Sequence, residues 1–105
     1  MTWRVEILEA ARDELCALPK DMRARFTRIV QLLEEFGPAN VHEPHVKSLQ
    51  SGLWEMRMTG RDGIARAIYV SAREERLVVV HVFVKKTQKT PQSAIALAMR
   101  RAKGL

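Results

Sequence analysis

The stretch from Arg76 to Pro91 constrains the fold of this chain more than any other. Its first part, Leu77 to Val84, is an apolar run that only His81 interrupts, with valines at four alternate positions. A short run so rich in β-branched residues predicts a strand that is covered on both faces. Cations follow it at Lys85, Lys86 and Lys89. A buried strand would hold these lysines out together, and we interpret them as a phosphate-facing group.

Length and composition predict one domain, which spans residues 1–105. At 105 residues and 47% hydrophobic content, the chain is large enough for one core and too small for two. The single Cys16 cannot form an internal disulfide, which suits a reducing compartment. No apolar segment approaches the roughly 20 residues that a membrane span needs. We therefore expect a cytoplasmic protein with no membrane partner.

The charge is distributed unevenly along the chain, whose net charge is +6. Residues 1–40 hold six basic and seven acidic side chains, whereas residues 41–105 hold twelve basic and five acidic ones. This asymmetry favours a polyanionic partner, most simply a nucleic acid. Charge alone does not distinguish DNA, RNA, an acidic protein or an anionic membrane.

Hydrophobic periodicity predicts an α+β fold. We expect a small antiparallel sheet, mainly a meander, with an N-terminal helix hairpin on one face and a short C-terminal helix. Asp21 should cap the second helix of the hairpin, and Thr90 should cap the last helix, with Pro91 at its first position. The expected strands are Trp3–Leu8, Leu53–Met58, Ile64–Ser71 and Leu77–Val84, and the expected helices are Glu9–Leu18, Asp21–Phe36 and a final one after Pro91.

Arg57 and Arg66 each interrupt one face of a predicted strand. An unpaired charge buried in a sheet is costly, so these positions require an explanation. The functional interpretation places both on the sheet face opposite the helix hairpin, beside the strand that ends in Lys85. The alternative is a structural role, as edge-facing or snorkelling side chains or in a salt bridge to Glu55.

Four segments together resemble a known family. They are Lys47-Ser48-Leu49, Gly52 to Arg57, Ala65 to Tyr69 and, most specifically, His81 to Pro91. With the order of the predicted elements, they resemble the RelE/ParE superfamily of type II toxins, and in particular its phage-derived, HigB-like branch. The C-terminal Tyr that some members carry is absent from the sequence.

The resemblance implies a toxin that is an endoribonuclease, or mRNA interferase, and that cuts mRNA on the ribosome. It also implies a cognate antitoxin, often a helix-turn-helix DNA-binding protein, that keeps the toxin inactive. Two alternatives remain open at this point. One is a ParE-like gyrase inhibitor without nuclease activity, and the other is a non-catalytic RNA-binding regulatory module.

Cleavage of RNA without a metal or cofactor needs a base for the ribose 2′-OH, an acid for the leaving 5′-oxygen and charge stabilisation. Carboxylates are poorly placed for this work, so we expect basic residues to carry it. Clustered lysines can share acid–base roles, and arginines suit phosphate oxygens. His81 is a further candidate, although a lone His in an apolar strand is more often a core residue. The catalytic candidates are Arg57, Arg66, His81, Lys85, Lys86 and Lys89.

Nucleic-acid contacts are predicted at three further residues, and no metal site is predicted. Lys47 and Arg61 would meet phosphates, and Tyr69 would stack on a base. His42 and His45 lie three residues apart in a loop, but no third ligand beyond Glu43 is evident, so this pair does not define a metal site.

Overall fold

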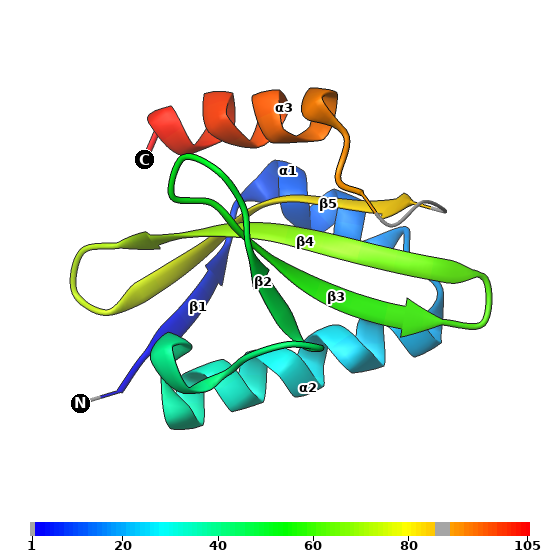
Figure 1. Cartoon of the computed structure of the whole chain (residues 1–105), viewed down its shortest axis with the longest axis horizontal. Helices are drawn as coiled ribbons and strands as arrows, with labels where there is room; N and C mark the ends of the chain where they lie inside the picture. The colour runs from blue at the N-terminus through cyan, green and yellow to red at the C-terminus, as the bar shows by residue number, and fades with distance from the viewer. Residues whose placement is uncertain (1, 86–88) are drawn as a thin grey trace.

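A computed structural model describes residues 2–85 and 89–105 of the chain, and it has the predicted α+β architecture (Figure 1). The helices and strands follow the predicted order. Their bounds are β1 Arg4–Ile7, α1 Glu9–Cys16, α2 Lys20–Phe36, the 3-10 helix η1 Pro38–Asn40, β2 Val46–Ser48, β3 Trp54–Gly60, β4 Gly63–Ala72, β5 Arg76–Lys85 and α3 Gln92–Lys103.

The five strands form one sheet in the order β1-β5-β4-β3-β2. Strands β2 to β5 pair antiparallel in sequence order, which confirms the predicted meander. Strand β1 pairs with β5 in parallel, opposite Arg76 to Val79 only. The second half of β5 therefore extends beyond the end of its neighbour. A two-residue turn, Arg61-Asp62, joins β3 to β4.

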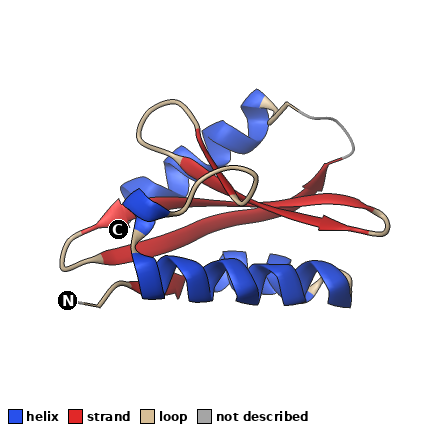
Figure 2. Cartoon of the chain, turned by 60° about the horizontal axis from the view of Figure 1, so that its bottom comes forward, coloured by secondary structure: helices blue, strands red, loops and turns tan. Residues whose placement is uncertain are grey.

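The helix hairpin covers one face of the sheet, and α3 lies on the other (Figure 2). The hairpin layer forms because α2 turns its apolar side, including Met22, Phe26 and Ile29, toward the strands. The sheet residues beneath it are Met56, Met58, Ala65, Ala67, Tyr69, Leu77, Val79 and Val82. The predicted alternation along β3 and β4 is thus confirmed.

A smaller core joins α3 to the opposite face of the sheet. Ala94, Ile95 and Ala98 of the helix are buried together with Ile68, Val78 and Val80 of the strands and with Leu53, which directly precedes β3. The remainder of this face carries Glu55, Arg57 and Arg66, which lie on the same side of their strands as Leu53 and Ile68. Among the described residues, no helix is long and apolar enough to cross a membrane.

Strict alternation along β5 would place the valines at even positions on one face, and a β-bulge overturns this expectation. Ile68 pairs with His81 and Tyr69 with Val79, so one residue of β5 is left over between them. Beyond the bulge, the alternation is shifted by one residue. As a result Val78 and Val80 pack against α3, whereas Val82 packs on the hairpin side. The valines at even positions do not share one face.

Both predicted helix caps are wrong. Helix α2 begins at Lys20, and Asp21 lies inside its first turn, where its carboxylate accepts the backbone N–H groups of Met22 and Arg61. The residue that precedes α3 is Pro91, which has no side-chain cap. The hydroxyl of Thr90 bonds to side chains of the sheet instead. These tertiary partners are more than 20 residues away, so local capping rules do not detect them.

Candidate active site

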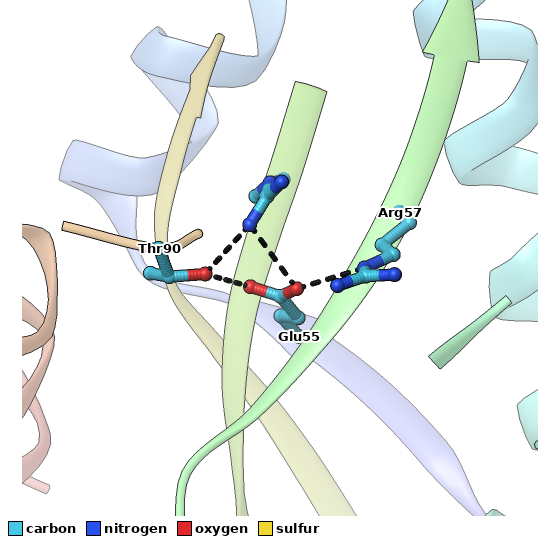
Figure 3. Close-up of polar contacts among 4 residues, drawn as sticks. Glu55, Arg57 and Thr90 are labelled. Carbon is cyan, nitrogen blue, oxygen red and sulfur yellow. Dashed lines mark hydrogen bonds and ion pairs between the residues drawn. The ribbon is translucent and has the colours of Figure 1, made fainter. Parts of the chain in front are cut away.

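A buried carboxylate lies at the centre of the candidate site. Glu55 of β3 has no solvent exposure, and its Oε2 atom accepts Arg57 Nε at 3.0 Å and lies 3.5 Å from a terminal nitrogen of Arg66. Its other oxygen accepts the hydroxyl of Thr90. Figure 3 shows Arg57 and Thr90 on either side of the Glu55 carboxylate. Three chain segments therefore meet at one acidic side chain.

The register of the sheet explains this convergence. Arg57 and Arg66 are direct partners across β3 and β4, and Glu55 lies one pair further along the same face, opposite Ile68. The carboxylate between the two guanidinium groups offsets their repulsion, which makes burial of Arg66 tolerable. Arg57 and Arg66 lie on the face opposite the hairpin, as the functional interpretation expected, and each also forms the salt bridge to Glu55 that the structural alternative expected.

The two arginines differ in what they can reach. The side chain of Arg66 is 1% exposed and lies beneath the surface, whereas that of Arg57 is 23% exposed. Arg57 faces a cleft of about 360 Å³. The cleft is lined by Lys47, Leu49, Gln50, Glu55, Arg57, Lys89, Thr90, Gln92 and Ile95. A guanidinium that is fixed from behind by Glu55 can offer its remaining donors to an anion in this cleft.

The cleft unites residues that are distant in sequence. Lys47 comes from β2, Arg57 from β3 and Lys89 from the segment before α3, and all three were candidate residues. These three cations and Arg66, which lies beneath them, outnumber the single carboxylate of the cleft lining, that of Glu55. The arrangement is suited to a polyanion that passes over the sheet.

The other lysine candidates are not part of the cleft lining. Lys85 is half-buried at the end of β5, where it pairs with Ile64. It lies on the same face as Arg66, further toward the turn between β3 and β4. Lys86 lies outside the described residues. Arg61 is exposed in that turn, and its backbone N–H is tied to Asp21 of α2 at 2.7 Å.

The proposed stacking role of Tyr69 is wrong. Its side chain is 1% exposed and packs on the hairpin face of the sheet, opposite to the face of Glu55 and Arg57. Burial also raises the pKa of its hydroxyl well above the usual range. A base in the cleft cannot reach this ring.

His81 belongs to a separate polar cluster at the edge of β5. Its Nδ1 atom lies 3.0 Å from Oε1 of Glu14 in α1, and the same oxygen accepts the Val82 N–H and a terminal nitrogen of Arg101. This cluster supplies hydrogen-bond partners to backbone groups in the part of β5 that extends beyond β1. The ring of His81 also stacks on Phe83. Its catalytic role stays a prediction, and these contacts indicate a structural one.

Sequence reasoning left Glu55 and Thr90 out of the site. Glu55 was considered only as a structural salt-bridge partner, and basic residues alone were assigned to the site because the carboxylates looked badly placed. Its position was nevertheless a signal, since Glu55 is the only acidic residue in β3, β4 or β5 and lies two residues before Arg57, on the same face. No local pattern indicates Thr90, because its partners come from β3 and β4.

Comparison with known proteins gives one family match and several structural ones. Residues 13–103 match the family described as phage-derived protein Gp49-like (DUF891). A mutant of E. coli toxin RelE in the free state superposes with a TM-score of 0.65 at 16% identity, over 96% of this chain and 98% of that one. No curated protein matches the chain.

Two toxin–antitoxin structures are also similar. An archaeal RelE–RelB complex from Pyrococcus horikoshii contains a chain with 25% identity and a TM-score of 0.60, over 85% of this chain and all of that one. The complex RelBE2 from Mycobacterium tuberculosis gives 19% identity and a TM-score of 0.59, over 81% of this chain and all of that one. The arrangement of sheet and helices is therefore that of RelE.

Proposed function

This chain belongs to the phage-derived Gp49-like family, within the RelE superfamily of type II toxins, and we propose that it is an endoribonuclease that cuts mRNA on the ribosome. The observation that carries the proposal is the cleft in which Arg57, backed by Glu55, lies with Lys47 and Lys89. A shallow cationic surface suits a phosphate backbone.

Arg57 is the proposed group for transition-state stabilisation. Guanidinium groups stay protonated and donate in a fork to two phosphate oxygens. When the ribose 2′-oxygen attacks the adjacent phosphorus, negative charge increases on the nonbridging oxygens. A donor that is already oriented by Glu55 stabilises this charge with little reorganisation. Arg66 supports the same arrangement from beneath, through its contact with Glu55.

Lysines are the proposed proton carriers. The reaction removes one proton from the 2′-hydroxyl and delivers one to the leaving 5′-oxygen. Lys89 lines the cleft and is the first candidate, with Lys85 and Lys86 as further ones. A lysine side chain accepts a proton through its neutral amine and delivers one from its ammonium form. Side chains alone thus suffice for the reaction that we propose, without a metal ion.

The proposed partners are the ribosome, its mRNA and a cognate antitoxin in the cytoplasm. The antitoxin is supported by the two similar structures, which are RelE–RelB and RelBE2 toxin–antitoxin complexes. Lys47 and Arg61 are proposed contacts to nucleic acid. Both are exposed.

Primer extension on a translated message tests the proposal. After induction of the protein in cells, new 5′ ends should appear within translated codons and not in an untranslated copy of the same message. The variant Arg57→Ala should produce none, whereas Arg25→Ala, which removes an exposed charge of α2, should cut like the parent. Growth arrest with DNA damage and without new 5′ ends would refute the nuclease and favour a gyrase target. Normal growth without new ends would favour a non-catalytic module.

A further inference from the structure

The hydroxyl of Thr90 connects the start of α3 to the buried charges of the sheet. The hydroxyl accepts a hydrogen bond from a terminal nitrogen of Arg66 at 2.8 Å, and it donates a hydrogen bond to Oε1 of Glu55. Both partners are almost fully buried, and Thr90 itself is 6% exposed. A hydroxyl supplies one donor and accepts through lone pairs, and here it does both.

The Thr90 hydroxyl does not cap helix α3, although its position in the sequence would favour that role. Threonine next to a proline at a helix start commonly caps the helix through its side chain. Here α3 begins at Gln92 after an uncapped Pro91, and the Thr90 hydroxyl is directed into the sheet. Its two partners lie 24 and 35 residues away in sequence. The bonds therefore hold the segment before α3, and with it the start of the helix, against the sheet.

Two residues that line the cleft depend on this connection. Lys89 is the immediate neighbour of Thr90 and is exposed in the cleft. Arg57 donates its Nε–H to the carboxylate whose other oxygen accepts the Thr90 hydroxyl. The Thr90 side chain thus holds the backbone next to Lys89. It also contacts Glu55, the acid that orients Arg57.

We propose that Thr90 is a positioning residue that sets Lys89 against Arg57 through its bonds to Glu55 and Arg66. The inference rests on the proposed function, because it assigns these two cations to one reacting phosphate. Thr90 does not touch the substrate in this role. Its hydroxyl determines the spacing between a cation of the α3 segment and a cation of β3.

Three variants isolate the hydroxyl. Thr90→Val keeps the shape of the side chain and removes both hydrogen bonds, whereas Thr90→Ser keeps the hydroxyl. Thr59→Val is the matched control, since Thr59 is exposed on β3 and does not line the cleft. Cleavage of a translated message on purified ribosomes gives kcat and KM for each. Small misplacements of reacting groups cost up to about 100-fold in rate, so kcat should fall by about that factor in Thr90→Val.

KM should stay near that of the parent, because Lys47 and Arg57 remain to bind phosphate. Thr90→Ser should restore most of kcat, and Thr59→Val should match the parent. A purely structural role would instead reduce the folded fraction of Thr90→Val, with both constants of the folded enzyme unchanged. Equal kcat for Thr90→Val and the parent would overturn the proposal.

Amide hydrogen exchange tests the positioning role without cleavage. The amides of Ala94 and Ile95 bond to the Pro91 carbonyl in the first turn of α3. In Thr90→Val they should exchange at least about tenfold faster, because the loss of even one of the two buried hydrogen bonds corresponds to about that factor. The amides of Met99 to Lys103 should be unchanged. Unchanged exchange at Ala94 and Ile95 would overturn the positioning role, even if the parent cuts RNA. Faster exchange with an inactive parent would refute the proposed function alone.

Discussion

Arg57 and Arg66 are direct cross-strand partners on β3 and β4, and both guanidinium groups approach the same oxygen of Glu55. Like charges opposite each other destabilise a sheet unless an acid separates them. The two arginines share one acid but differ in exposure. Consequently the buried Arg66 stabilises the arrangement, and the partly exposed Arg57 is available to a ligand.

Glu55→Gln should destabilise the protein strongly. The amide keeps the shape of the side chain but leaves two guanidinium groups without their shared counter-charge. Loss of one partner in a buried ion pair costs about 3 kcal/mol, and we expect the free energy of unfolding in urea to fall by that amount. Glu35→Gln is the matched control, because Glu35 is exposed on α2. Equal unfolding midpoints for both variants would show that the pairs around Glu55 contribute little.

Lys89→Ala and Lys85→Ala should differ in activity. Both remove one positive charge, but only Lys89 lines the cleft with Arg57. A proton carrier contributes about 100-fold or more to the rate, so Lys89→Ala should reduce cleavage of a translated message by at least that factor. Lys85→Ala should reduce it by less than about tenfold, through charge alone. Equal losses in the two variants would mean that total charge, not the cleft, determines activity.

The sequence predicted the features that depend on the periodicity of apolar residues within a single strand or helix. Alternation along β3 and β4 correctly divided Met56 and Ala67 from Arg57 and Arg66, because strand side chains point to opposite faces. The short turns predicted the meander. The bulge in β5 was not predictable in this way, since nothing in the valine run indicates where one extra residue interrupts the pairing.

The candidate site was only half predictable. Arg57 and Arg66 were found because charges within apolar strands need an explanation. Glu55 was undervalued because we judged acids by their distance from the lysines in sequence. Thr90 was assigned to a cap because capping rules consider only neighbouring residues, whereas its partners are in the sheet. Tyr69 was misassigned because residue type suggested stacking and burial prevents it.

Tyr69 should ionise only at strongly alkaline pH. It is the only tyrosine of the chain, so the phenolate absorbance reports this side chain alone. Burial raises its pKa well above the unfolded value of about 10. The folded state therefore retains the proton that the unfolded state releases, and stability should fall as pH rises above about 10. Titration of the native protein should show no phenolate at pH 10 to 11, whereas the urea-unfolded chain should titrate there. A native titration that matches the unfolded one would contradict the buried position.

Glu14→Gln should lower the free energy of unfolding and make it depend less on pH in the acid range. Partial burial alone would raise the pKa of Glu14, but hydrogen bonds from Arg101, the Val82 N–H and His81 outweigh it and lower the pKa. The native carboxylate thus contributes stability that is present above the unfolded pKa of about 4.3 and is lost as pH falls through the lower native value.

The free energy of unfolding, measured between pH 6 and pH 3, tests this expectation. At pH 6 the variant should be less stable than the parent by about 1 kcal/mol, and the difference should shrink toward pH 3, where the carboxylate of the parent is protonated as well. Asp13→Asn, at an exposed position in the interior of the same helix, is the control and should follow the parent at every pH. A difference that is constant with pH would show that Glu14 acts through packing and not through its charge.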